Sequence, residues 1–77
     1  MENKLEELYI IRDEMLLNPN VASTVVWDAA RLATEDDYLY KIMLDWMRET
    51  NLEAKKDILK EITDYTEEVL RKLSVRH

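Results

Sequence analysis

The stretch from Tyr38 to Met47 constrains the fold of this chain more than any other part of the sequence. When its residues are placed about 100° apart around a helix, apolar side chains cover most of the circumference. One face carries Leu39, Ile42, Met43 and Trp46. The narrow strip left for water carries Asp37, Lys41, Asp45 and Arg48. A helix that is apolar on almost every side is normally enclosed by its neighbours. We therefore predict that residues 35–49 form the central helix of a small all-α domain, covered by the rest of the chain or by a second molecule.

Size limits how much of that cover one molecule can provide. The chain has 77 residues, enough for a single domain spanning residues 1–77, and a domain of this size hides only about 60% of the surface that its unfolded form exposes. Domains this small usually depend on a disulfide, a metal or a partner subunit for stability. The sequence has no cysteine, which excludes disulfides, thiolate metal sites and thiol catalysis. Oligomerisation or unusually good helix packing is therefore expected to supply the stability.

The charge and the missing glycines exclude further classes of protein. The formal net charge is −6, and the basic residues are scattered along the chain, whereas contact with nucleic-acid phosphates needs clustered Lys and Arg. No apolar run approaches the ~20 residues of a membrane span, and no signal-peptide pattern is present. Glycine is absent, which excludes the phosphate-binding turns of nucleotide sites. We expect a cytoplasmic protein that binds neither nucleic acid nor a membrane.

Two helices are predicted before the central one, at residues 2–17 and 21–33. Proline disfavours helical backbone in the residue before it and has no N–H, so Pro19 ends the first helix. The second helix can begin with Asn18 as its cap and Pro19 at its first position, or with Asn20 as its cap, and both starts remain open. Its β-branched residues also suit a strand. We reject a strand because no other segment could pair with it, and its backbone groups would stay unsatisfied.

A fourth helix is predicted at residues 51–74. Thr50 begins a capping-box pattern for it, as Thr34 does for the central helix. The joint between these two helices is so short that they should be antiparallel neighbours. We predict a four-helix antiparallel bundle, with a piece of a helical-hairpin solenoid as the alternative. The fourth helix is much longer than the second, so its last turns need cover from the first helix or from another subunit.

Clusters of carboxylates are the candidates for a metal-binding or catalytic site. One face of the fourth predicted helix carries Asp57, Glu61, Asp64 and Glu68. A metal ion needs several oxygens converging from different segments, so we interpret these outward-pointing residues as a solvated acidic face, with binding of a basic partner as the alternative. Residues 35–37 are acidic and fit a charged helix start. The only histidine is the terminal His77, and we predict no catalytic, metal-binding or cofactor-binding residue.

Aromatic and apolar side chains exceed what a single small core needs. Several lie on the flanks of the predicted helices, and aromatic residues and Met are enriched in protein interfaces. Our candidates for an interface are Trp27, Tyr38, Tyr40, Leu44, Met47, Leu70 and Leu73. The alternative is that they fill the corners of a four-helix core. We favour the interface, because a short chain without cross-links has few other sources of stability.

The sequence thus favours a non-enzymatic protein interaction module over an enzyme. We expect an acidic helical bundle that self-associates as a symmetric homodimer, has a regulatory or adaptor role and needs no cofactor. Another protein is an additional candidate partner. The alternative function is a small acidic inhibitor or antidote, whose acidic face occupies a basic surface of its target.

Overall fold

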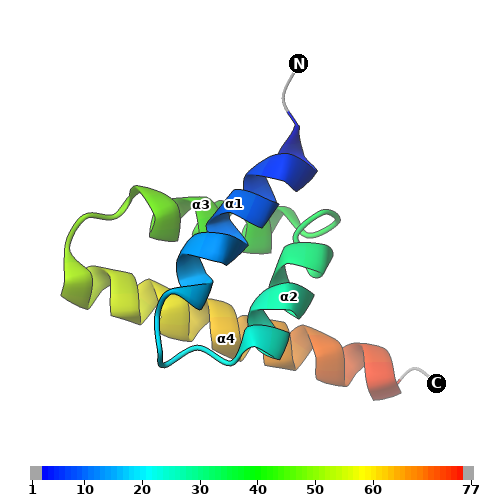
Figure 1. The fold of residues 1–77 in the computed structure, drawn as a ribbon. Helices are drawn as coiled ribbons and strands as arrows, with labels where there is room; N and C mark the ends of the chain where they lie inside the picture. The colour runs from blue at the N-terminus through cyan, green and yellow to red at the C-terminus, as the bar shows by residue number, and fades with distance from the viewer. Residues whose placement is uncertain (1–2, 76–77) are drawn as a thin grey trace.

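The computed structural model describes residues 3–75, and this part of the chain contains four helices. They are α1 (Lys4–Leu16), α2 (Ser23–Leu32), α3 (Asp37–Arg48) and α4 (Leu52–Val75) (Figure 1). Each predicted helix is present, and its bounds differ by at most two residues from those expected. The predicted all-α four-helix bundle is therefore confirmed. Residue 2, where the first helix was expected to begin, lies outside the described part.

Asparagine and aspartate side chains begin three of these helices. Asn3, Asp36 and Asn51 precede α1, α3 and α4, and the Oδ1 atom of each accepts a hydrogen bond from a backbone N–H two or three residues further on. Each bond satisfies a donor that a helix leaves free in its first turn. The predicted caps, Thr34 and Thr50, are therefore wrong. The Thr34 hydroxyl donates instead to a backbone carbonyl in α2, at 2.8 Å.

The start of α2 also differs from both alternatives that the sequence left open. The cap position is Ala22, which has no side-chain acceptor for the first N–H groups. Asn18 Oδ1 accepts instead from the Asn20 N–H at 3.0 Å, which closes a turn between α1 and α2. Because α2 lacks a side-chain cap and is rich in β-branched residues, its stability depends on the packing of residues such as Val26 and Ala29, which are buried.

The core draws side chains from all four helices. Its largest fully buried side chains are Leu8, Ile11, Met15, Val26, Leu39, Met43, Ile62 and Thr66. On α3 the whole predicted apolar face, from Leu39 to Trp46, is buried. Like α2, this helix contacts each of the other three, and it buries more and larger side chains than α2 does. The central position predicted for it is therefore confirmed.

The two last helices are antiparallel neighbours, as predicted. Tyr38 at the start of α3 meets Tyr65 on α4, whereas Trp46 near the end of α3 meets Lys55 near the start of α4. With 12 residues α3 is about 18 Å long, and with 24 residues α4 is about 36 Å long. About half of α4 therefore extends beyond α3.

The end of α4 is only partly covered by the rest of the molecule. Helix α2 packs across α4, but α1 contacts only α2 and α3 within residues 3–75 (Figure 1). The suggestion that the first helix covers the last turns of the fourth is therefore wrong. Leu70 is half-buried, Leu73 is 43% exposed and Val75 is 84% exposed. We call residues 69–75 the α4 overhang.

Thr66 carries a buried hydroxyl with no hydrogen-bond partner among the described residues. A buried polar group left in this state costs roughly 1–3 kcal/mol. Replacing Thr66 with Val, which has nearly the same shape, is expected to raise the free energy of unfolding by about 1 kcal/mol in urea denaturation. Thr63→Val is the control, because the Thr63 hydroxyl donates to the Leu59 carbonyl at 3.0 Å and its loss should bring no gain. A Thr66→Val variant no more stable than the parent would contradict this explanation.

Candidate functional site

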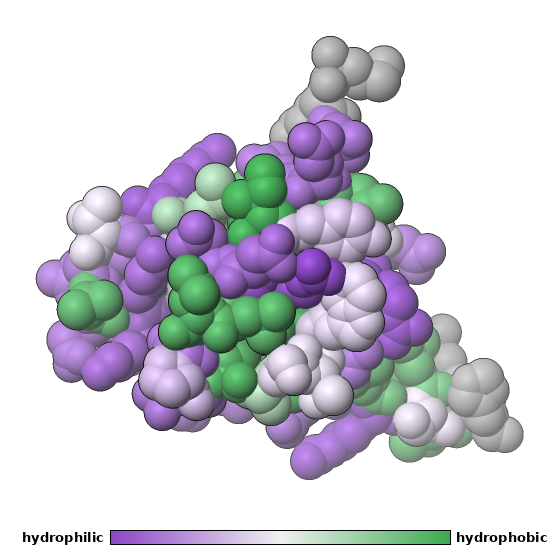
Figure 2. Space-filling model, viewed as in Figure 1, coloured by the Kyte–Doolittle hydropathy of each residue, from purple (hydrophilic) through white to green (hydrophobic). Residues whose placement is uncertain are grey.

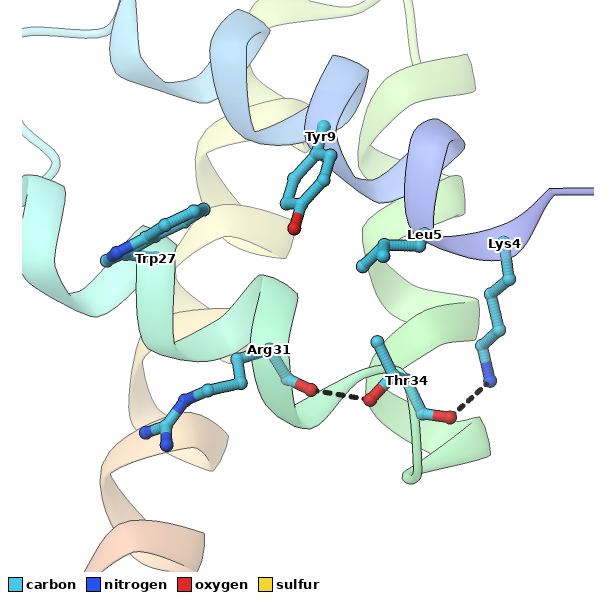
Figure 3. Close-up of a pocket in the computed structure, with 6 residues that line it drawn as sticks. All are labelled: Lys4, Leu5, Tyr9, Trp27, Arg31 and Thr34. Carbon is cyan, nitrogen blue, oxygen red and sulfur yellow. Dashed lines mark hydrogen bonds between the residues drawn. The ribbon is translucent and has the colours of Figure 1, made fainter.

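An open groove runs between α1 and α2 and consists of two hollows that share Trp27. The larger, of about 620 Å³, is lined by Lys4, Leu5, Tyr9, Trp27, Arg31 and Thr34 (Figure 3). The smaller, of about 200 Å³, is lined by Arg12, Leu16, Ser23, Thr24 and Trp27. We refer to the two hollows together as the α1–α2 groove. Figure 2 shows hydrophobic side chains gathered over the lower part of α1 on this face of the molecule.

Helix periodicity aligns the groove along α1. Leu5, Tyr9, Arg12 and Leu16 recur at intervals of three or four residues, and such spacing places side chains on one side of a helix. Eleven residue steps separate the first from the last, so the groove follows α1 for about 16 Å. In Figure 3, Tyr9 from α1 and Trp27 from α2 face each other, and Leu5 lies toward Thr34.

Arg12 holds the two aromatic rings of the groove together. Its guanidinium carbon lies 4.3 Å from the centre of the Trp27 ring and 5.1 Å from that of Tyr9, and the two ring centres are 5.9 Å apart. Cation–π contacts of this kind contribute about 0.5–1 kcal/mol at exposed sites. Trp27 is nevertheless 52% exposed. The contacts therefore fix its orientation without removing it from solvent.

Three cations and no carboxylate are found among the described residues that line the groove. They are Lys4, Arg12 and Arg31. Each cation also forms an ion pair with a carboxylate that does not line the groove. Lys4 pairs with Asp37 at 3.5 Å, Arg12 with Asp13 at 2.9 Å, and Arg31 with Asp28 at 3.2 Å. Lys4 also donates to the Thr34 carbonyl at 3.4 Å, which links α1 to the end of α2 (Figure 3). The groove is thus an apolar and aromatic surface with positive charge at its edges.

A second cluster joins α3 to α4 through two tyrosines. The rings of Tyr38 and Tyr65 are 4.9 Å apart and nearly edge to face. The Tyr38 hydroxyl donates to the Glu61 carboxylate, and the Tyr65 hydroxyl donates to Asp36 Oδ2 at 2.6 Å. Since Asp36 Oδ1 caps α3, this one carboxylate ties the start of α3 to the middle of α4.

These hydrogen bonds shift the pKa values of the groups that make them. The bond to Tyr65 is the main cause that lowers the pKa of Asp36 below its usual 3.8. The same bond, with burial adding to it, raises the pKa of Tyr65 from 10.0 to about 12. The bond to Glu61 raises the pKa of Tyr38. All three shifts favour a protonated tyrosine beside an ionised carboxylate.

The Asp36–Tyr65 pair is expected to make stability depend on pH at both extremes. Because the pKa of Tyr65 is raised in the folded state, its stabilisation is complete below pH 10 and is lost as the pH rises toward about 12. Because the pKa of Asp36 is lowered, its stabilisation is complete above pH 3.8 and is lost below it. Tyr65→Phe is expected to remove the step near pH 12 from a titration of tyrosinate absorbance. The free energy of unfolding of this variant should also fall less than that of the parent at high pH and at low pH. Tyr9→Phe is the control, because Tyr9 packs on Trp27 in the α1–α2 groove. A step near pH 12 that persists in Tyr65→Phe would contradict the pairing.

The predicted acidic face lies beside the tyrosine pair and is exposed. Asp57, Glu61, Asp64 and Glu68 line a shallow hollow together with Tyr38, Lys60 and Tyr65. Lys60 pairs with Asp64, and Lys72 with Glu68, each at 3.2 Å. No group of three or more residues of metal-ligand type converges within residues 3–75. His77 lies outside that range.

The seven candidate interface residues do not form one surface. Trp27 lies in the α1–α2 groove, Tyr38 packs on Tyr65, and Leu73 lies on the α4 overhang. Trp27, Tyr38, Met47 and Leu73 are exposed. Tyr40, Leu44 and Leu70 are half-buried, and the first two pack against the core. The Tyr40 hydroxyl also donates to Glu7 at 2.7 Å.

The α1 side of the groove was missed by sequence reasoning. Leu5 is 44% exposed, whereas Leu8, Ile11 and Met15, which form the core stripe of α1, are buried. The signal was present in the spacing of Leu5, Tyr9, Arg12 and Leu16. It could not be separated from the core stripe, because apolar residues surround most of this helix.

No helix in the described part of the chain is both long enough and apolar enough to cross a membrane. Comparison with known protein families, curated proteins and solved structures finds no match to this chain.

Proposed function

We propose that this chain is a non-enzymatic protein interaction module, an acidic helical bundle that self-associates as a symmetric homodimer and has a regulatory or adaptor role. The observation that supports the proposal best is the α4 overhang. There Leu73 and Val75 are exposed at the end of the longest helix in the described chain. Pairing with a second copy would remove this apolar surface from water, a change that favours association.

Charges on the overhang and on the two residues before it suit a two-fold contact. Glu67 and Glu68 precede Arg71 and Lys72 on α4 by four residues each. If two overhangs pair antiparallel, the acidic turn of one copy faces the basic turn of the other, which is the self-complementarity that a symmetric dimer requires. Such exposed ion pairs add little affinity, but they favour one register. The apolar side chains between them would supply the contact.

The oligomeric state of the full chain tests this proposal. In sedimentation equilibrium at micromolar concentration, we expect a mass of twice the 9.2 kDa of one chain. The midpoint of thermal unfolding should also rise with protein concentration, because association stabilises the folded state. A monomer of 9.2 kDa with a concentration-independent midpoint would rule out the homodimer.

The acidic face supports a second candidate function, that of a small inhibitor or antidote that occupies a basic surface of its target. Asp57 and Glu61 are exposed beside Tyr38 and can present charge to a partner. This candidate ranks second because Glu61 already accepts from Tyr38, and the other two acids of the face already pair with lysines. Binding to a basic protein that weakens with salt would support it. Unchanged binding after reversal of all four acids to Lys would exclude it.

The proposal assigns no catalytic residue and no cofactor, and it places the protein in the cytoplasm. Fractionation of the host cell, with the chain detected by an antibody, tests the location. Recovery of the chain outside the cytoplasmic fraction would correct that part of the proposal and leave the interaction role standing.

A further inference from the structure

We infer that the α1–α2 groove binds an acidic amphipathic helix, about three turns long, from a second protein. The inference rests on the proposed interaction function, but it concerns a different surface. None of the described residues that line the groove belongs to α4. One face of the bundle can therefore be occupied by a partner while the α4 overhang pairs with another copy.

The shape of the groove suits a helix rather than a small molecule. Sites for small molecules enclose most of their ligand, whereas Leu5 and Trp27 are about half exposed. The groove also follows α1 for about 16 Å, which matches about three turns of a helix. The two hollows share Trp27 and can each receive an apolar side chain, as grooves that bind a helix receive its anchors at positions i and i+7.

Trp27 is held ready for such a contact. The Arg12 guanidinium packs on its ring, and Tyr9 packs beside it. A partner that covers the indole therefore has little side-chain freedom to remove on binding. Large aromatic and Arg side chains at the centre of an interface often carry much of its binding energy, and both types lie here at the junction of the two hollows.

The positive charge of the groove indicates which kind of helix it binds. The groove has Lys4 and Arg31 at its edges, Arg12 where the two hollows meet, and no lining carboxylate among the described residues. Two of the carboxylates that pair with these cations, Asp13 and Asp37, are themselves well exposed, and exposed ion pairs are weak enough to exchange partners. Acidic side chains that flank the apolar stripe of a bound helix can take their place. The positive edges therefore favour an acidic helix over a basic one.

A second copy of this chain fits the groove poorly. Two grooves facing each other across a two-fold axis would bring like cations together, which is unfavourable. The exposed apolar end of α4 carries Arg71 and Lys72 beside Leu73, so it too would place positive charge against positive charge. The acidic face of α4 has the opposite charge, but the apolar side chains of that helix segment, such as Leu59 and Ile62, are buried in the core and cannot enter the groove of another copy. The occupant consistent with these observations is a different protein.

The test uses a fluorescently labelled synthetic peptide of about 12 residues, with Leu at the first, fifth and eighth positions and Glu on both flanks of that stripe. Added to the full-length protein, it should give a saturable rise in anisotropy with a dissociation constant below about 100 μM. The same peptide with Lys in place of Glu should bind at least about tenfold more weakly. Absence of binding by the acidic peptide, or equal binding of the two, would overturn the inference.

Variants locate the binding on the protein. Trp27→Ala should weaken binding of the acidic peptide at least about tenfold, and Arg12→Ala should also weaken it and reduce its dependence on salt. Met47→Ala, an exposed apolar side chain on α3, is the control and should leave binding unchanged. Unchanged binding in Trp27→Ala would overturn the inference. So would tighter binding of sodium dodecanoate or of a single-stranded oligonucleotide in competition with the peptide.

Sedimentation of the same proteins separates failure of this inference from failure of the homodimer. The Trp27→Ala protein should bind the peptide more weakly but still sediment with the mass of the dimer, because Trp27 is not part of the α4 overhang. A wild-type protein that is monomeric but binds the acidic peptide would reject the homodimer and support the groove. A dimer that dissociates when Trp27 is replaced would place Trp27 in the contact between copies and overturn the inference.

Discussion

Trp46→Ala is expected to lower the free energy of unfolding by about 3–5 kcal/mol, the range for removing a large aromatic side chain from a core. Trp46 lies on the buried face of the central helix α3, and Lys55 packs over its ring at 4.2 Å. The total free energy of unfolding of a domain of this size is only about 3–5 kcal/mol. The variant should therefore be largely unfolded at 25 °C, which far-UV circular dichroism and urea denaturation would measure.

Trp27→Ala is the matched control, because it makes the same change at an exposed position. Trp27 contacts Tyr9 and Arg12 at the surface, so its loss should cost about 1–2 kcal/mol, well below the cost at Trp46. A folded Trp27→Ala protein is also what the peptide experiment requires. Equal destabilisation by the two substitutions would show that the division of the two indoles into core and surface is wrong.

Leu73→Asp is expected to weaken self-association at least about tenfold. Full burial of an exposed Leu side chain contributes about 1.5–3 kcal/mol, but only 43% of Leu73 is still exposed in the single chain. Two copies in a symmetric dimer would therefore lose roughly 1.3–2.6 kcal/mol, and about 1.4 kcal/mol corresponds to a tenfold change in affinity. The substitution also introduces a carboxylate into an apolar contact. Because Leu73 is 43% exposed in the single chain, the fold itself should survive, and circular dichroism would show unchanged helix content.

Leu52→Asp tests whether that effect is specific to the overhang. Leu52 is exposed at the opposite end of the same helix, where an acidic residue is favoured by the helix dipole. Sedimentation equilibrium should give the dimer mass for Leu52→Asp and the monomer mass for Leu73→Asp. If Leu73→Asp sediments as the parent does, the α4 overhang is not the contact between copies.

Local chemistry accounts for most of what the sequence predicted correctly. The apolar face from Leu39 to Trp46 repeats with the period of a helix, and the structure buries it as expected. Short polar side chains before each apolar run located the helix starts within two residues. The particular cap was harder to predict, because Thr34 lies only two residues before Asp36 and both side chains can cap a helix. The geometry that selects Asp36 includes its second bond, to Tyr65, which comes from another helix.

The arrangement of α1 could not be predicted in the same way. Apolar residues surround most of this helix, so periodicity alone did not show that Leu8 and Ile11 would be buried while Leu5 and Tyr9 would be exposed. That choice follows from packing on α2 and α3 and from the absence of contact with α4 in the described chain. The α1–α2 groove exists because of it.

The sequence by itself determined the four helices, their approximate ends and the central place of α3, since these depend on neighbours within one or two turns. Only the tertiary structure decided which apolar side chains stay at the surface, because that depends on how helices distant in sequence cross one another. For this reason the acidic face and the excess length of α4 were visible in the sequence, whereas the groove between α1 and α2 and the lack of contact between α1 and α4 were not.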